Sequence, residues 1–170
     1  NGVSTITEFK HDFMYIVEGT SSFYLPYTEG FEWVDSLNET GMVGFVENDQ
    51  LWEIVNGISA TGDQSVKTNS EADTFQYKYS VVSPTLDLTG TTSPHIDFKY
   101  AFAQKDSTNN DVMIVKVSKN CGGTWLTLNQ QTVTLPTHAG FVDSNYVPIA
   151  ADWRQMAITN IPGSYKVNTF

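Results

Sequence analysis

Hydrophobic and polar residues alternate most clearly near the middle of the chain. Between residues 96 and 102 the even-numbered positions are aliphatic or aromatic, and the odd-numbered positions are mostly polar. This period of two is typical of a strand with one buried face. Residues 112–117 are more continuously apolar, which indicates a strand covered on both faces. Asn120 to Gly123 favour a turn, because glycine tolerates positive φ, and Trp125 begins the next strand.

Weaker patterns predict further strands on both sides of this centre. They are expected within residues 3–17, 50–56, 75–81, 132–135, 146–149 and 151–161. Residues 34–50 are mostly polar and are interpreted as a loop that crosses the surface, and residues 57–73 are rich in glycine, serine, threonine and aspartate and are interpreted as a connection. Helical periodicity is absent, and turn residues recur about every eight to twelve positions. The pattern predicts an all-β fold, namely a β-sandwich of the jelly-roll type.

Composition limits the classes of function. The 170 residues carry a net charge of −10, which disfavours nucleic-acid and anionic-membrane binding, because both need clustered lysine and arginine. No apolar run reaches the roughly eighteen residues of a membrane-spanning helix, so membrane insertion is not expected. The single cysteine, Cys121, cannot form an internal disulfide and is interpreted as a small turn residue. An acidic surface suits a secreted protein and supplies carboxylates for calcium.

Six segments together resemble a group of extracellular modules. They are PYTEGFE (26–32), QLWEIVNG (50–57), VSPTLDLTG (82–90), IDFKYAFA (96–103), DVMIVKVSKNCGGTW (111–125) and DWRQMAI (152–158). These segments resemble the MAM-like, galactose-binding-like jelly-roll modules of large proteins that Bacteroidetes-type bacteria export through type IX secretion. Such modules often follow a zinc metallopeptidase domain of the cytophagalysin or pappalysin type.

The resemblance implies a domain organisation and a location. Residues 1–19 are expected to be the closing strand and linker of a preceding PKD-like β-sandwich, and residues 20–170 the MAM-like domain. That domain is expected to lack its last strand or strands, so the chain is interpreted as a fragment at both ends. A secreted or cell-surface location follows from the same resemblance, with the other domains of the same polypeptide as partners.

The function implied is that of a non-catalytic accessory or adhesion module, for spacing, docking or ligand binding. One alternative is the C-terminal portion of a secreted zinc metallopeptidase whose catalytic domain lies outside this chain. Another alternative is a carbohydrate-binding module, so a glycan or a surface protein is a candidate partner.

Catalysis within this chain is not expected. A zinc peptidase of this type needs the pattern His-Glu-x-x-His on a helix. None of His11, His95 and His138 is followed by glutamate or spaced to share a helical face. The sequence also contains no Gly-x-Ser-x-Gly elbow, phosphate-binding Walker loop or Cys-x-x-Cys pair.

Structural calcium is the one cofactor that the sequence suggests. The resemblance implies a site between the first and last strands, with Glu32 as a first-strand ligand. Asp87 and Asp111 border the central strands and are further candidates, because calcium prefers carboxylate oxygens. A solvated carboxylate or a turn cap is the alternative role for each of the three.

Aromatic residues offer candidate ligand contacts. Trp33 and Trp153 are the candidates for an exposed stacking platform. Other aromatic residues at alternating strand positions are assigned to the core instead. These are Trp52, Tyr77, Tyr79, Phe98, Tyr100 and Phe102.

Two loops carry a possible modification signal. Asp35-Ser36-Leu37 and Asp106-Ser107-Thr108 resemble the short motif on which exported Bacteroidetes proteins are O-glycosylated, so Ser36 and Ser107 are candidate acceptors. Asn38-Glu39-Thr40 has the form of an N-glycosylation site, which would apply only to a eukaryotic source.

Overall fold

The structure is a computed structural model. It describes residues 23–46, 52–68, 79–108, 111–120, 122–134, 137–142, 146–159 and 161. The strand predicted over residues 3–17, the linker up to residue 19, the C-terminal residues 162–170, Tyr77 and Cys121 lie outside these ranges. Within the described residues there is no α-helix, and no helix has the length and apolar character needed to cross a membrane.

Short β-strands make up the regular structure, which confirms the predicted all-β class. They are β1 (Phe23–Tyr24), β2 (Val43–Val46), β3 (Glu53–Asn56), β4 (Gln64–Lys67), β5 (Tyr79–Val82), β6 (Leu86–Asp87), β7 (Ile96–Tyr100), β8 (Val112–Val117), β9 (Leu126–Thr134) and β10 (Arg154–Ile158). One 3₁₀ helix, η2 (Leu37–Thr40), precedes β2.

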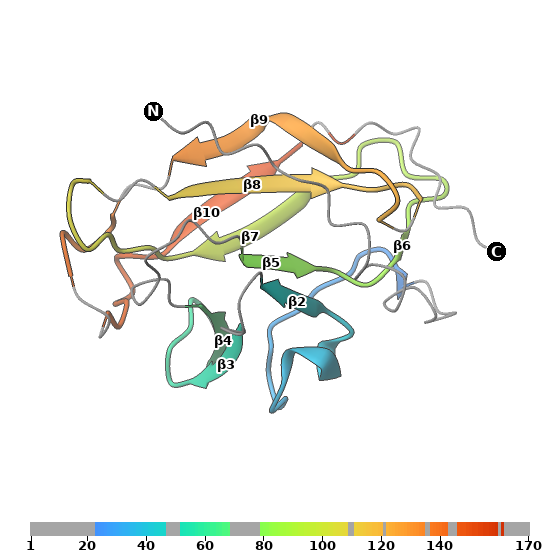
Figure 1. The fold of residues 1–170 in the computed structure, drawn as a ribbon. Helices are drawn as coiled ribbons and strands as arrows, with labels where there is room; N and C mark the ends of the chain where they lie inside the picture. The colour runs from blue at the N-terminus through green and yellow to red at the C-terminus, as the bar shows by residue number, and fades with distance from the viewer. Residues whose placement is uncertain are drawn as a thin grey trace.

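The described strands associate in pairs (Figure 1). The pairs β2–β5, β3–β4, β7–β10 and β8–β9 are antiparallel, and the short β1–β6 pair is parallel. Two of the antiparallel pairs are local hairpins, whereas β2–β5 and β7–β10 join segments far apart in the sequence. In Figure 1 the β3–β4 hairpin and the η2–β2 segment extend from the same side of the central strands.

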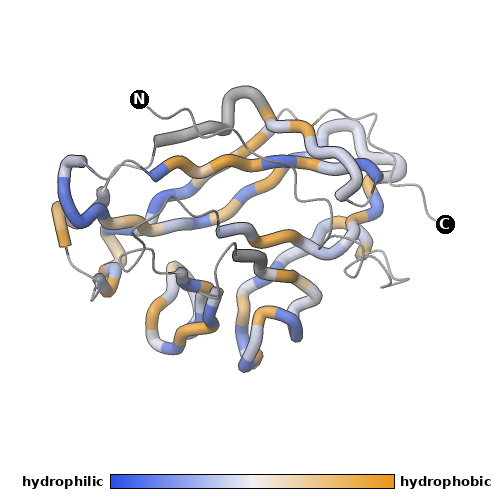
Figure 2. Tube along the Cα trace, in the orientation of Figure 1, coloured by the Kyte–Doolittle hydropathy of each residue, from blue (hydrophilic) through white to orange (hydrophobic). Residues whose placement is uncertain are grey.

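The hydrophobic core lies between the β7–β10 and β8–β9 pairs. Leu128, Ile158 and Ile161 are buried there, and Phe98, Met156 and Val115 are among the half-buried residues packed against them. Phe98 is the register partner of Met156, and both side chains pack against the core cluster. Figure 2 shows hydrophobic and hydrophilic residues alternating along β7. The period of two predicted for residues 96–100 is therefore confirmed, with Asp97 and Lys99 exposed.

The aromatic residues assigned to the core are less deeply placed than predicted. Phe98 packs against the core cluster, and Tyr100 is half-buried with its ring 6.3 Å from that of Phe98. Tyr79 and Phe102 are half-buried. Trp52 is also half-buried and lies over β2, where a Cβ on Gly44 would come within 3.2 Å of its Cδ1.

Two strand predictions for the second half of the chain were wrong. Residues 112–117 are not covered on both faces, because Val112 is 48% exposed and Ile114 is 38% exposed. The side chains at these positions lie on the outer face of β8, so hydrophobicity alone overstated their burial. Residues 146–149 form no strand. Residues 132–134 of the strand predicted over 132–135 are the end of the nine-residue β9.

Two predicted loops contain regular structure. Residues 34–50 were interpreted as a loop, yet they form η2 and β2, and Gly41 with φ 76° ends η2 in the left-handed region. Residues 57–73 were interpreted as a connection, yet β4 pairs with β3 across a turn. The sequence of β4 is Gln-Ser-Val-Lys, so its strand conformation comes from backbone pairing rather than from hydrophobic alternation.

Candidate binding site

Trp33 is the most exposed large hydrophobic residue in the described structure. Its side chain is 95% exposed, and it lies in the segment of residues 25–36, here called the Trp33 loop. A single exposed apolar residue is common, but tryptophan side chains are on average largely buried. The position of Trp33 is therefore consistent with the prediction that it is accessible to a ligand.

The backbone of the Trp33 loop is in an unfavourable conformation at two positions. Phe31 has φ 61° and Trp33 has φ 63°, in the left-handed region that side chains with a Cβ rarely adopt. Each residue costs at least about 1 kcal/mol in this conformation. Interactions elsewhere in the loop must offset that cost.

Glu29 provides the first of these interactions. Its Oε1 accepts a hydrogen bond of 2.6 Å from the backbone N–H of Phe31. The hydroxyl of Tyr27 lies 3.5 Å from Oε2 of Glu29 and 3.4 Å from the carbonyl oxygen of Thr40. Burial and the neighbouring Glu29 carboxylate raise the pKa of Tyr27. The first half of the loop is thus folded around the Glu29 carboxylate.

Glu32 and Gln64 join the second half of the loop to the β3–β4 hairpin. Oε1 of Glu32 accepts hydrogen bonds from the backbone N–H groups of Asp63, at 2.9 Å, and Gln64, at 3.2 Å. The Gln64 side-chain amide donates to the carbonyl oxygen of Val34 at 3.0 Å and accepts from the N–H of Val34 at 3.3 Å.

These bonds hold the residues on both sides of Trp33. Glu32 is bound on one side and Val34 on the other, while the indole between them faces solvent. A side chain presented on a fixed backbone loses less conformational entropy when it binds than one on a free loop. The arrangement is suited to contact with a ligand or partner.

The three candidate calcium ligands have different surroundings. Glu32 uses one carboxylate oxygen for the hairpin bonds described above. Asp87 accepts a 2.8 Å bond from the N–H of Thr89, and the side chain and backbone of Thr89 lower the pKa of Asp87. Asp111 is exposed just before β8, where partial desolvation raises the pKa of its carboxyl group.

The structure does not bring these carboxylates into one cluster. Within the ranges that the structure describes, no group of three or more His, Cys, Asp or Glu residues is placed to hold a metal ion. Turn capping, the alternative role considered for Asp87, accounts for its hydrogen bond to Thr89. Calcium binding by this chain stays a prediction.

The remaining predicted site residues are separate from one another. Trp153 is half-buried just before β10, and Ser36 and Ser107 are both exposed. Ser36 is the residue before η2, where its hydroxyl oxygen lies 3.0 Å from Oε1 of Glu39. Ser107 lies in a turn where Asp106 accepts a 2.7 Å bond from the N–H of Thr108. Accessibility suits both as acceptors of a glycan, which stays a prediction.

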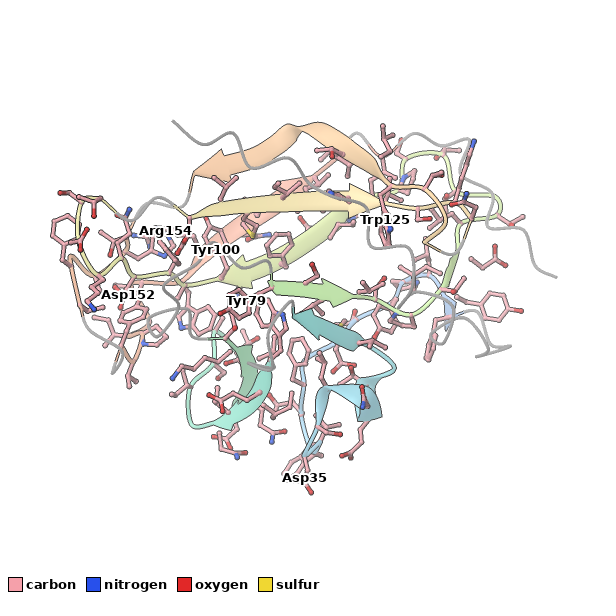
Figure 3. The ribbon with its side chains drawn as sticks, viewed as in Figure 1. Asp35, Tyr79, Tyr100, Trp125, Asp152 and Arg154 are labelled. Carbon is pink, nitrogen blue, oxygen red and sulfur yellow. The ribbon has the colours of Figure 1, made fainter. Side chains whose placement is uncertain are left out.

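A second polar cluster, not anticipated from the sequence, lies near the start of β10. Its charged members Asp152 and Arg154, with Tyr100 of β7, are labelled in Figure 3. His138 packs its ring 5.3 Å from that of Tyr100, and its Nδ1 accepts a 3.3 Å bond from the N–H of Phe102.

The backbone of His138 is bound as well, since its N–H donates to the carbonyl oxygen of Phe102 at 2.9 Å. Burial, and secondarily the charge of Arg154, lower the pKa of His138, although Asp152 opposes the shift. Asp152 is buried and accepts a 2.9 Å bond from the N–H of Ile149. The bonds of His138 join the 137–142 segment to the residues that follow β7, and the bond of Asp152 closes the turn before β10.

Tyr146 belongs to the same cluster. Burial, with the nearby negative charge of Asp152, raises the pKa of Tyr146 to about 12. Spacing in the sequence could not reveal this cluster, because its members come from three separate segments that only the fold brings together.

Comparisons with protein-family models, with curated proteins and with solved structures each find no match to this chain.

Proposed function

We propose that this chain is a non-catalytic binding module, used for docking or adhesion by a secreted or cell-surface protein, with Trp33 as its main contact residue. The single observation that carries the proposal is an indole 95% exposed between two residues whose positions are fixed by hydrogen bonds. Covering a tryptophan removes about 200 Å² from water, worth about 5 kcal/mol before the costs of binding. A single fixed indole can thus contribute much of the free energy of a moderate interaction.

Backbone strain in the Trp33 loop supports the same proposal. Left-handed conformations at Phe31 and Trp33 are unfavourable, and neither residue belongs to the hydrophobic cluster of the core. Strain of this kind concentrates at functional sites, where the surrounding structure maintains it. Here the strained residue and the exposed indole are the same residue, Trp33.

The architecture included in the proposal is a MAM-like jelly-roll sandwich, placed beside other domains of the same polypeptide. Its support is the hydrophobic cluster between the β7–β10 and β8–β9 pairs, since two sheets packed face to face form a sandwich. Loops at the margins of such sandwiches commonly carry binding residues, because insertions and exposed side chains are tolerated there. The Trp33 loop occupies a position of this type, outside the core.

The proposal can be tested by binding to arrays of immobilised peptides and glycans. The wild-type chain is compared with Trp33→Ala and with Phe141→Ala, which removes another exposed aromatic side chain, from the 137–142 segment. We expect probes whose signal is lost in Trp33→Ala and kept in Phe141→Ala, with both variants melting close to the wild type. A wild-type chain that binds no probe, or a Trp33→Ala chain that binds the same probes as the wild type, contradicts the proposal.

A further inference from the structure

The charges around Trp33 restrict the class of partner that this site can take. Residues 23–46 and 52–68 contain six acidic residues and a single basic one, Lys67. The acidic residues are Glu29, Glu32, Asp35, Glu39, Glu53 and Asp63. Lys67 is the register partner of Glu53 on the neighbouring strand, so it lies opposite one of these acids.

Three of the acids are exposed and are near Trp33, two of them along the chain and one on the hairpin that the loop contacts. Asp35 follows Trp33 by two residues and projects at the end of the loop (Figure 3). Glu39 is exposed in η2, beside Ser36. Asp63 is exposed on the hairpin, where its N–H binds the Glu32 carboxylate. Exposed carboxylates thus lie on the Trp33 loop, on η2 directly after it and on the hairpin bound to it, and none of these three is the register partner of Lys67.

We infer that the partner of the Trp33 loop is a basic protein segment that places a lysine or arginine side chain on the face of the Trp33 indole. This inference rests on the proposed function, whose contact residue it shares. A cation over an indole is attracted by the negative face of the ring. The surrounding carboxylates attract the same cation and its basic neighbours, and they repel anionic partners.

Charge complementarity selects this partner over the other classes. Acidic glycans, phosphates and nucleic acids meet repulsion from Asp35, Glu39 and Asp63. A neutral glycan can stack on the indole, but it gains no long-range attraction from the carboxylates. A basic segment uses both features of the surface at once.

The test is an NMR titration of the whole chain with three probes: a short Arg-Gly-Ser repeat peptide, the matching Glu-Gly-Ser repeat and a neutral cello-oligosaccharide. The indole N–H resonance of Trp33 is assigned by its disappearance in Trp33→Phe. We expect the arginine peptide to shift this resonance, with an affinity that falls as salt is raised, and the glutamate peptide to leave it unchanged. Trp33→Ala is expected to weaken binding of the arginine peptide by about tenfold or more.

Two paired variants separate a local charge effect from a general one. Asp35→Asn with Glu39→Gln removes two charges near Trp33, and Asp97→Asn with Asp111→Asn removes two exposed charges on β7 and before β8. The first pair is expected to weaken binding of the arginine peptide by about two- to fivefold per charge removed, and the second pair is expected to weaken it by much less. Equal effects of the two pairs would show attraction by net charge alone and overturn the inference.

The outcomes also separate this inference from the proposed function. A Trp33 resonance shifted by the cello-oligosaccharide, with an affinity independent of salt, overturns the basic partner but keeps Trp33 as a binding residue. A Trp33 resonance that no probe shifts counts against both. A shift by the arginine peptide that follows the two variant pairs as expected supports both.

Discussion

Two glycines in one hairpin allow a matched test of the contact that fixes the Trp33 loop. Gly57 and Gly62 both lie in the turn between β3 and β4, with φ values of 70° and 74°. A Cβ on Gly57 would meet nothing within 4 Å, whereas a Cβ on Gly62 would lie 2.7 Å from Cδ of Glu32 and closer still to Oε1. Alanine at residue 62 therefore has to displace the Glu32 carboxylate.

The two substitutions should differ in stability by the value of the Glu32 contact. Each alanine carries a cost of about 1–2 kcal/mol for the left-handed conformation, and each equally reduces the entropy of the unfolded chain. Gly62→Ala in addition breaks the bonds from the N–H groups of Asp63 and Gln64. Bonds to a charged acceptor are worth about 1.5–3 kcal/mol when buried. Because Asp63 is exposed, we expect Gly62→Ala to be less stable than Gly57→Ala by about 1–2 kcal/mol.

Urea unfolding of four chains measures this difference: each alanine substitution alone, and each combined with Glu32→Ala. Without Glu32 the two glycine substitutions should cost the same, because the displaced group is gone. Gly62→Ala should also weaken the binding of any ligand that depends on Trp33, because the substitution releases Glu32, the residue before Trp33. Equal stabilities of Gly57→Ala and Gly62→Ala, or a difference that persists without Glu32, would refute the reasoning.

Three further predictions concern the rest of the fold. Ile158 has no exposed surface, so Ile158→Ala should lower the free energy of unfolding by about 2–5 kcal/mol in denaturant titrations. Ile149 is 66% exposed, so Ile149→Ala should lower it by less than about 0.5 kcal/mol. Similar losses for the two variants would place the core elsewhere. The pKa of His138 is lowered in the folded state, so its contribution to stability is present above about pH 6.5 and is lost as the pH falls through the folded-state pKa. In urea titrations at several pH values, His138→Gln should lose less stability on acidification than the wild type. An unchanged dependence of stability on pH would contradict this prediction. Ultraviolet titration should find one tyrosine with a pKa of about 12 that is missing from Tyr146→Phe, and identical titrations would exclude Tyr146 as that residue.

The strands with one buried face were the part of the fold most open to prediction. Alternation over residues 96–100 located β7, and the pattern of residues 151–161 located β10, because both strands place every second side chain on the core. The pattern could not show that β7 and β10 pair with each other. That pairing spans more than fifty residues of sequence and depends on the whole fold.

Strands stabilised mainly by backbone pairing gave no hydrophobic signal. β4 is polar at three of its four positions and was taken for part of a connection. η2 did have a signal that could have been used, because Ser36 and Glu39 have the spacing of a capping box. The opposite error occurred in β8, where apolar residues at 112 and 114 face outward.

Of the candidate site, the residue type could be predicted and its setting could not. The sequence makes Trp33 a possible ligand contact because tryptophan is suited to stacking, but it does not predict the left-handed backbone angles at Phe31 and Trp33. Propensities assign those angles to glycine or asparagine, so no local rule predicts them here. The bonds that offset their cost come partly from Glu29, two positions before Phe31, and partly from residues 63 and 64, about thirty positions away in the sequence.

Glu32 has two possible roles, as a calcium ligand and as a hydrogen-bond acceptor for the β3–β4 hairpin. The resemblance made it a calcium ligand, and the structure uses its Oε1 to bind the β3–β4 hairpin. A carboxylate can accept about four hydrogen bonds or metal contacts in all, so the hairpin bonds do not exhaust its capacity. The hairpin bonds fix the backbone beside the exposed indole, because Glu32 directly precedes Trp33. Any ligand that binds through Trp33 therefore depends on Glu32, whether or not the ligand touches it.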